Sequence, residues 1–353
     1  MSKVGQIERA TQNRIVKLFQ AQLQYNYLGN WEDREGNSNI EETALRNYLQ
    51  GTKKYSNELI NKAIFALKKE ANINSNDNLY TANKEVYSML RYGTAKKVEA
   101  ISKMETVQFI DWANPLNNHF AIAEEVTIKG AKERRPDIVL YINGIAIGVL
   151  ELKKACIAAN EGIRQNISNQ SHLFNKAFFT TIQLILAGND SNGLYYGTTK
   201  TEEKYFLKWK EDNDAYNPDE ILLDKHVLQF CKKERLLEII HDFLIFDFGT
   251  KKLCRPNQYF GIKEAQKYIG KKEGGIIWHT QGSGKSLTMV WLAKWILENN
   301  ATARLLIVTD RTELDEQIEG VFLGVGETIK RTSSGADLVS KLNQTTPRLI
   351  CSF

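Results

Sequence analysis

The chain has 353 residues, enough for two domains that each bury a core of their own. Its content of 42% hydrophobic and 25% charged residues is typical of a folded globular protein, and no stretch approaches the roughly 18 uncharged apolar residues that span a bilayer. The N-terminal segment carries charges and no apolar signal core, and the cysteines form no CxxC pair. These features argue against export and suggest neither a disulfide framework nor a zinc site, so we expect a cytoplasmic protein. The net charge of +5 permits nucleic-acid binding without indicating it.

The first part of the chain is predicted to be helical. Residues 6–24 place Ile7, Ile15 and Phe19 at mostly helical spacing, which indicates an amphipathic helix. A polar stretch over 29–38 interrupts the pattern. Helical periodicity then dominates residues 40–104, so we take 1–105 as a helical region that opens the first domain.

From about residue 119 the hydrophobic period changes to that of strands. Four segments rich in β-branched residues and bounded by turns are predicted strands: 119–130, 136–142, 145–154 and 181–190. Asn143-Gly144, between the second and third, is the strongest short hairpin signal. A helix over about 160–176 separates the third strand from the fourth. This order predicts a mixed sheet with flanking helices, with its core at about 106–200.

The C-terminal part predicts a second α/β domain. Residues 200–235 have no clear period, and a helix over 234–248 is predicted to close the first domain, 1–249. In the second domain, 250–353, helices and strands alternate: helix 262–270, strand 274–280, helix 286–300, strand 304–310, helix 312–322 and strand 348–353. This alternation favours a doubly wound parallel sheet.

The first chemical signal is Pro136-Asp137 followed by Glu151-Leu152-Lys153. Alternate residues of a strand share a face, so Glu151 and Lys153 point the same way. Two carboxylates brought together can hold Mg²⁺, which prefers oxygen ligands. A lysine beside them can position or deprotonate a water molecule and offset charge on a phosphate. The alternative is that these are ordinary polar residues at strand ends.

The predicted hairpin raises a geometric difficulty. With a strict two-residue turn at Asn143-Gly144, Asp137 pairs with Leu150, and paired residues share a face. Asp137 and Glu151 would then point to opposite sides of the sheet. A metal site therefore requires a bulge, a bend or strong splaying, which we expect where the strand begins at Pro136.

This segment resembles the PD-(D/E)xK nuclease fold in the form found in type I restriction subunits. The resemblance implies Asp137 and Glu151 as metal ligands and Asp137, Glu151, Lys153 and Gln165 as catalytic residues. In that family a helix carries a glutamine, here Gln165, and a tyrosine four residues later, where this sequence has Asn169. The departure puts this helix's contact with DNA in doubt. Glu8 could correspond to an acidic residue near the metal, although a solvated carboxylate on a helix face is the simpler interpretation.

The second chemical signal is TQGSGKS, between a predicted strand and a predicted helix. Its residues are the candidate nucleotide-binding set: Thr280, Gln281, Gly282, Ser283, Gly284, Lys285 and Ser286. Two glycines let backbone N–H groups face an anion at a helix N-terminus. Lys285 is then expected to reach the β- and γ-phosphates of ATP, and Ser286 to coordinate Mg²⁺. His279 stands where the full pattern has a glycine, a variant familiar from superfamily 2 helicases.

Neighbouring segments resemble the same motors. RPNQYFGIKEAQ resembles their adenine-recognition element, with Gln258 as the candidate partner of the base, although Asn257-Gln258 could equally start a helix. LLIVTDRTELDEQI resembles the next helicase motif of type I restriction subunits. The matching residues are Asp310, Arg311, Leu314, Asp315 and Gln317. These likenesses imply the start of a RecA-like domain.

Taken together, the resemblance implies the N-terminal part of an ATP- and Mg²⁺-dependent motor and endonuclease subunit of a type I restriction enzyme. Its expected partners are double-stranded DNA and the methyltransferase and specificity subunits. The acidic Walker B box and the second lobe of such motors are not found, so we expect this chain alone not to turn over ATP. Two alternatives stay open: a nuclease–helicase of repair or phage defence, and a DNA-binding assembly module with a vestigial nuclease site.

Overall fold

The computed structural model describes residues 3–73, 78–97, 104–130, 132–154, 159–171, 176–211, 220–310, 312–324, 326 and 328–352. The chain forms two compact units, Met1–His241 (unit 1) and Asp242–Phe353 (unit 2). The sequence-predicted boundary between 249 and 250 lies a few residues further along the chain. No helix within the described ranges is both long and apolar enough to cross a membrane.

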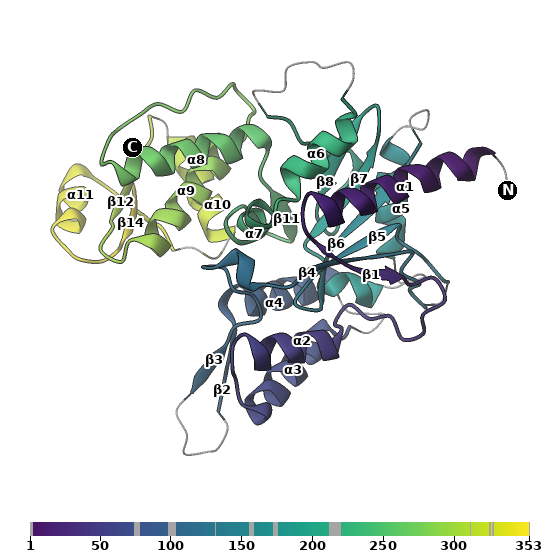
Figure 1. The fold of residues 1–353 in the computed structure, drawn as a ribbon. Coiled ribbons are helices and arrows are strands. Elements are labelled where there is room, and N and C mark those ends of the chain that lie inside the picture. The colour runs from purple at the N-terminus through teal and green to yellow at the C-terminus, as the bar shows by residue number, and fades with distance from the viewer. Residues whose placement is uncertain are drawn as a thin grey trace. The chain divides into compact units, whose positions relative to one another are not determined.

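Unit 1 is built on a seven-stranded mixed sheet in the order β1-β4-β5-β6-β7-β8-β9. The strands are β1 (Asn26–Asn30), β4 (Phe120–Glu124), β5 (Ile138–Ile142), β6 (Ile145–Leu152), β7 (Leu184–Asn189), β8 (Gly193–Gly197) and β9 (Leu207–Lys208). β1 runs parallel to β4 and β6 parallel to β7, and the other neighbours are antiparallel. The predicted mixed sheet with flanking helices is confirmed (Figure 1).

Helices cover both faces of this sheet. Unit 1 contains α1 (Lys3–Ala21), α2 (Glu42–Gly51), α3 (Asn57–Ala71), α4 (Leu79–Tyr92), α5 (Ala159–Asn169), α6 (Leu222–Phe230) and α7 (Lys233–Asp242), with short 3-10 helices at Pro115–Asn117, Lys176–Thr180 and Glu203–Tyr205. Gly162 of α5 lies against Ala187, whereas Leu223 of α6 lies against Gly188. Since neighbouring residues of a strand face opposite sides, α5 and α6 lie on opposite faces of β7.

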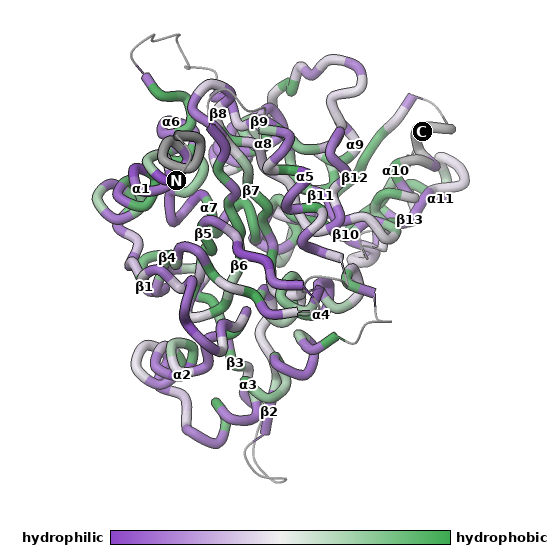
Figure 2. Tube along the Cα trace, turned by 90° about the vertical axis from the view of Figure 1, so that its right-hand side faces the viewer, coloured by the Kyte–Doolittle hydropathy of each residue, from purple (hydrophilic) through white to green (hydrophobic). Residues whose placement is uncertain are grey.

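The central strands carry the core. Every residue of β4, β5, β6 and β7 is buried, and these strands are the hydrophobic interior of unit 1 in Figure 2. Burial on both faces explains why these segments are nearly continuous apolar runs without a clear alternation. The runs were sufficient to predict strands, but they contain little information about which residue pairs with which.

Two predictions in the N-terminal region need correction. The polar stretch predicted to interrupt the helices overlaps β1, and the helical stretch to residue 104 contains β2 (Thr94–Lys96), which pairs with β3 (Glu105–Val107). β1 was missed because it is an edge strand with mostly exposed side chains, so no apolar alternation marks it. The helical prediction is otherwise confirmed by α2, α3 and α4.

The helix predicted over 234–248 is too long. α7 ends at Asp242, and the chain continues as β10 (Leu244–Asp247), which pairs with β11 (Thr250–Leu253) in an antiparallel ribbon of unit 2. The run Leu244-Ile245-Phe246 is fully buried, and a short buried apolar run does not distinguish a strand from a helix by periodicity.

Unit 2 contains a three-stranded parallel sheet in the order β12-β14-β13. Its elements are α8 (Pro256–Gly270), α9 (Lys285–Asn299), β12 (Leu305–Val308), α10 (Thr312–Gly324), β13 (Lys330–Arg331), α11 (Gly335–Leu342) and β14 (Leu349–Ser352). Apolar residues of α9, α10 and the strands, including Val290, Phe322 and Leu349, form its core. The parallel pairing and the helices before and after β12 agree with the sequence prediction.

The strand predicted over 274–280 does not form. These residues have no regular secondary structure, and Ile276 and Trp278 are 91% and 89% exposed. A strand needs a neighbour that satisfies its backbone N–H and C=O groups. In the described part of unit 2, the sheet pairs only β12, β13 and β14, so this segment has no strand beside it.

Candidate active site

The β5–β6 hairpin is closed by the predicted Asn143-Gly144 turn. Both residues have positive φ, 52° and 82°, as a two-residue hairpin turn requires. The buried Asn143 side chain accepts a hydrogen bond from His119 N (2.7 Å) and donates one to Phe109 O (2.9 Å). A Cβ on Gly144 would lie 2.7 Å from Glu41 O, so the position also requires glycine for space.

A bulge in β6 resolves the geometric difficulty of this hairpin. Tyr141 pairs with Ala146, but Leu140 pairs with Gly148, so Ile147 is an extra residue on β6. The register beyond it pairs Ile138 with Leu150, and one step further Asp137 comes opposite Glu151. The two carboxyl groups therefore share a face. The required irregularity exists, but our expectation that it lies at Pro136 was wrong.

Asp137 is held at the end of β6. Its Oδ2 accepts a hydrogen bond from Leu152 N (2.6 Å), and its backbone carbonyl accepts one from Glu125 N (3.0 Å). Burial raises the pKa of Asp137 to about 6, although the Leu152 N–H and the positive charge of Lys153 act in the opposite direction. Both the protonated and the ionised form of the Asp137 carboxyl group are therefore present slightly below neutral pH.

Glu151 is fully buried beside Asp137. Its Oε1 lies 3.4 Å from Asn169 Nδ2, and its Oε2 has no hydrogen-bond partner among the described residues. Burial raises the pKa of Glu151 well above its ordinary value, and the negative charge of Asp137 raises it further. An ionised carboxylate in this position is costly unless a proton or a cation accompanies it.

Lys153 follows β6 directly and lies among carboxylates. Its backbone N–H donates to Gly188 O (2.9 Å), and its Nζ lies 3.2 Å from Glu8 Oε1. Burial acts to lower the pKa of Lys153, but the negative charges of Asp137, Glu151 and Glu8 outweigh it and raise the pKa. Lys153 is therefore an ammonium at neutral pH, which suits it to offset charge rather than to accept a proton from water.

Glu8 is not a solvated carboxylate, as the simpler interpretation of the sequence had it. It pairs with Lys153, its side chain is 33% exposed, and it lines the same cavity as Asp137. One turn along α1, the buried Gln12 donates hydrogen bonds to Glu124 Oε2 (3.3 Å) and Asp137 O (3.2 Å). Their spacing of four residues marks one helix face, but only the packing of α1 shows what that face contacts.

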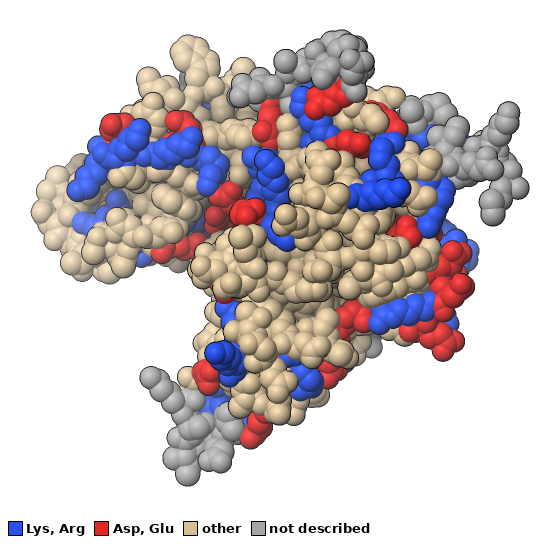
Figure 3. Space-filling model, in the orientation of Figure 1, with Lys and Arg blue, Asp and Glu red and all other residues tan. Residues whose placement is uncertain are grey.

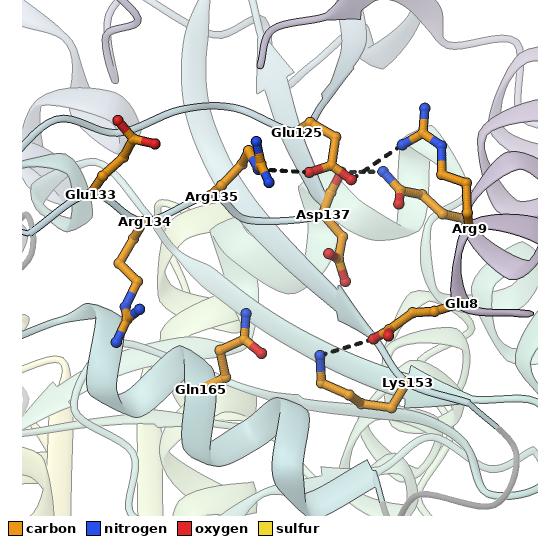
Figure 4. Close-up of a pocket in the computed structure, with 10 residues that line it drawn as sticks. Glu8, Arg9, Glu125, Glu133, Arg134, Arg135, Asp137, Lys153 and Gln165 are labelled. Atoms are coloured by element: carbon orange, nitrogen blue, oxygen red, sulfur yellow. Dashed lines mark hydrogen bonds and ion pairs between the residues drawn. The ribbon is translucent and has the colours of Figure 1, made fainter. Parts of the chain in front are cut away.

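These groups surround a cavity of about 490 Å³. Figure 4 shows Asp137 pointing into it between Gln165 and Lys153. The lining residues are Glu8, Arg9, Gln12, Glu125, Glu133, Arg134, Arg135, Asp137, Lys153 and Gln165. Among these residues, Glu125 forms ion pairs with Arg9 (3.1 Å) and Arg135 (3.0 Å). Glu151 is not among the lining residues and is fully buried next to Asp137.

The glycine-rich segment of unit 2 forms a loop that leads into α9. Gly282 and Gly284 have φ of +77° and +84°, and Gly284 is the residue before the helix. The exposed Lys285 donates from Nζ to His279 O (3.3 Å) and Thr280 O (3.2 Å). The N-terminus of α9 and this lysine suit an anion. Positive side chains also gather over α8 in Figure 3.

The side chain of Gln258, the expected base-binding residue, is engaged within the protein. Its Oε1 accepts a hydrogen bond from Arg255 N, and its Nε2 donates to Gly284 O. In the later helicase-like motif, Asp310 is exposed at the end of β12. Arg311 lies outside the described residues, and the side chains of Leu314, Asp315 and Gln317 on α10 are not described either.

Comparison with known proteins identifies the family. Residues 5–204 match the family described as "Type I restriction enzyme R protein N terminus". The chain belongs to this family. The resemblance predicted from the sequence is therefore confirmed. Residues 257–353 match the family described as "SWI2/SNF2 ATPase".

Similar proteins carry matching names. This chain is 28% identical over 297 residues to a "Putative type I restriction enzyme MjaIXP endonuclease subunit" of Methanocaldococcus jannaschii, covering 73% of its own length and 28% of the relative. It is 25% identical over 319 residues to a "Type I restriction enzyme HindI endonuclease subunit" of Haemophilus influenzae, covering 84% of this chain and 30% of the relative. The chain thus spans less than a third of the length of either relative.

The asparagine that stands in place of the expected tyrosine has a structural role in α5. Gln165 of α5 lines the cavity, and Asn169, one turn later, is buried against Glu151. The sequence singled out Asn169 only as the missing tyrosine. The combination of a buried amide with a buried carboxylate depends on α5 lying over β6, where Gly162 allows close approach to Glu151 Cβ. Spacing along the chain does not contain that information.

Proposed function

We propose that unit 1 is a PD-(D/E)xK-type nuclease that hydrolyses phosphodiester bonds of double-stranded DNA with Mg²⁺. The observation that supports this most strongly is the pairing of Asp137 with Glu151, which the bulge at Ile147 makes possible, beside the ammonium of Lys153. The family match over 5–204 and the names of the relatives support the same reaction.

The residues present fit a divalent cation. The Glu151 Oε2 atom is buried without a hydrogen-bond partner, and the pKa values of both Asp137 and Glu151 are raised. A cation that takes oxygen ligands would remove both penalties at once. When bound, Mg²⁺ polarises the phosphate and lowers the pKa of a bound water molecule.

The protein side chains have separate tasks in this proposal. Asp137 and Glu151 hold the cation, and the Lys153 ammonium offsets negative charge that develops on the phosphate. Glu8 holds Lys153 through the ion pair at 3.2 Å. Gln165, on the cavity wall formed by α5, supplies an amide that can donate to a phosphate oxygen or to the water molecule.

For unit 2 we propose the start of a RecA-like domain that binds ATP with Mg²⁺. The segment Thr280–Ser286 would hold the phosphates on backbone N–H groups, with Lys285 on the terminal phosphates and Ser286 on Mg²⁺. The match of 257–353 to an ATPase family supports this. We further propose that residues 1–353 alone bind ATP without turnover, so that a steady-state ATPase assay gives the same rate for the wild type and for Lys285→Ala.

In the whole subunit, ATP-driven translocation of DNA would precede cleavage. Its partners would be methyltransferase and specificity subunits, and its location the cytoplasm. These proposals follow from family membership together with the relatives' names, and they concern a protein longer than this chain.

The test uses the full-length subunit assembled with its partner subunits. Glu151→Ala should abolish DNA cutting and leave ATP-driven translocation intact, because the two reactions use different units. Lys285→Ala should abolish both. Glu133→Ala is the matched control, since Glu133 lines the same cavity and points away from Asp137 (Figure 4). Cutting by Glu151→Ala at the wild-type rate would reject the nuclease site and leave a DNA-binding assembly module.

A further inference from the structure

Two arginines, Arg9 and Arg135, converge on one carboxylate at the cavity of unit 1. Arg9 Nη1 donates to Glu125 Oε1 at 3.1 Å, and Arg135 Nε lies 3.0 Å from Glu125 Oε2. All three residues line the cavity together with Asp137. In Figure 4 they lie on one side of Asp137, and Gln165 lies on the other. Two guanidinium groups are therefore held close together beside the proposed cation site.

Further carboxylates fix these two guanidinium groups. Arg9 Nη2 donates to the buried Glu124 at 3.1 Å, and Arg135 also pairs with Glu32. Like charges held close together repel each other, and the shared carboxylate of Glu125 offsets that repulsion. Both guanidinium groups are thus in place before a ligand arrives, which lowers the entropy lost when one binds.

The backbone of Glu125 is constrained as well. Its φ is 51°, in the left-handed region that residues other than glycine seldom adopt. Its N–H donates to Asp137 O at 3.0 Å. Uncommon backbone conformations of this kind cluster at functional sites. The carboxylate that gathers the arginines is therefore tied directly to the backbone of Asp137.

Both arginines remain accessible to a ligand. The side chains of Arg9 and Arg135 are 41% and 40% exposed, whereas that of Glu125 is 16% exposed. Each guanidinium group contacts carboxylates of the described residues through two of its three nitrogen atoms. Because a guanidinium group carries five N–H donors, donors remain for the oxygens of a phosphate, which arginine binds in a fork geometry.

The chain places each arginine next to a residue of the proposed nuclease site. Arg9 follows Glu8, the partner of Lys153, and Arg135 precedes Asp137 by two residues. At most roughly 7 Å of chain separates Arg135 from Asp137. A phosphate bound by the arginines could therefore belong to the same DNA strand as a phosphate at the cation.

We propose that Arg9 and Arg135 together bind a backbone phosphate of double-stranded DNA beside the phosphate that is cleaved, and that Glu125 positions both guanidinium groups for it. This inference rests on the proposed nuclease function of unit 1. It adds a site for an uncleaved phosphate, which fixes how the strand lies across the cavity. No sequence motif marked any of these three residues.

The experiment measures binding of a short DNA duplex to the 353-residue chain over a range of salt concentrations. Ca²⁺ replaces Mg²⁺ to slow cutting, because its coordination is larger and less regular. Each phosphate contact contributes about 0.9 to the slope of log affinity against log salt. The double variant Arg9→Gln, Arg135→Gln should weaken binding and lower the magnitude of this slope by about 1, and each single variant should lower it by about half as much. The double variant Arg9→Lys, Arg135→Lys keeps both charges and should restore the slope.

A matched control is Arg46→Gln, because Arg46 of α2 pairs with Glu42 (3.0 Å) and is not among the cavity-lining residues. It should bind DNA with the wild-type affinity and slope. Melting temperatures show whether each variant is folded. If the double glutamine variant does not fold, the single variant of the exposed Arg135 decides.

A wild-type slope in the folded glutamine variants would overturn the inference. Weaker binding with that same slope would overturn it as well, because such a result indicates a structural role and no lost phosphate contact. The nuclease function is judged separately from cutting by Glu151→Ala. If that variant loses cutting while the arginine variants keep the wild-type slope, the nuclease site stands and only the phosphate site fails.

Discussion

Two lysines, Lys153 in unit 1 and Lys285 in unit 2, lie in opposite electrostatic surroundings. Lys153 is 13% exposed and shares its site with the carboxyl groups of Asp137, Glu151 and Glu8. The exposed Lys285 donates only to backbone carbonyl groups, and no carboxylate pairs with it in the described part of unit 2. Carboxyl groups that surround one lysine in the first site suit a cation. A lysine beside a helix N-terminus in the second site suits an anion.

The two sites also differ in construction. The unit 1 site draws its side chains from α1, β6, α5 and the residue before β5, and the bulge at Ile147 sets its geometry. The unit 2 loop is one continuous segment that leads into α9, and Gln258 of α8 donates a hydrogen bond to Gly284 just before that helix. A site assembled from distant elements depends on the whole fold, whereas a continuous loop depends on local backbone contacts. Substitutions should therefore act on one site without affecting the other.

Lys285→Ala should produce the largest difference between the two sites. Removing the ammonium should abolish ATP binding by this chain, because in the proposed site Lys285 supplies the side-chain charge for the terminal phosphates. Binding of Mn²⁺ to unit 1, measured without nucleotide, should be unchanged. Calorimetric titrations with each ligand check both statements. An ATP affinity equal to that of the wild type would contradict the assignment of the loop.

Asn169→Ala should affect unit 1 and not unit 2, and its effect should be smaller than that of Lys285→Ala. The Asn169 amide lies 3.4 Å from Glu151 Oε1 and helps to orient the carboxylate that carries the free Oε2. Residues of this kind behind a metal ligand typically contribute about 10- to 100-fold in metal affinity. Mn²⁺ should therefore bind about tenfold more weakly, with ATP binding unchanged. The exposed Asn160 of the same helix is the control, and equal Mn²⁺ affinities of Asn169→Ala and Asn160→Ala would rule out this role.

The sign of the pKa shifts in unit 1 predicts how stability depends on pH. Folding raises the pKa of Asp137 to about 6 and that of Glu151 well above its ordinary value. The folded chain therefore holds protons more tightly than the unfolded chain. The stability from this pair is complete below the unfolded pKa values, about 4, and is lost as pH rises through the folded ones.

The melting temperature in a chelator should accordingly fall between about pH 5 and pH 8, and it should fall less in Glu151→Gln, which lacks one of the two titrating groups. Mn²⁺ should raise the melting temperature more at pH 8 than at pH 5, because the cation competes with protons for the carboxylates. Thermal melting of both proteins across this range tests the prediction. Parallel curves for the wild type and Glu151→Gln would show that this pair does not titrate as described.

Much of the fold, and the residues of the two candidate sites, could be predicted wherever the signal is local. The Asn143-Gly144 dipeptide predicted the hairpin, since few other sequences adopt positive φ at both positions. Asp137, Glu151 and Lys153 could be identified because their residue types suit metal-assisted chemistry. The glycines before α9 marked the loop for the same reason. In each case, the types of a few residues within one short segment carry the physical cause.

The remaining features depend on tertiary contacts that are not visible along the chain. The bulge at Ile147 lies in a strand buried on both faces, so no polar alternation reveals its register. The pairing of Glu8 with Lys153 requires α1 to pack on the sheet. The strand expected over 274–280 has the right residue types but no neighbouring strand among those described, and β-propensity alone does not form a sheet.

The central claim is that Asp137 and Glu151 together hold one divalent cation. Calorimetric titration of Mn²⁺ into the 353-residue chain without nucleotide tests it most directly. The account predicts one site in the wild type and in Lys285→Ala, and no detectable binding in Asp137→Asn or Glu151→Gln, provided that both variants melt as folded proteins. Mn²⁺ binding to Glu151→Gln with the stoichiometry and affinity of the wild type would contradict the claim.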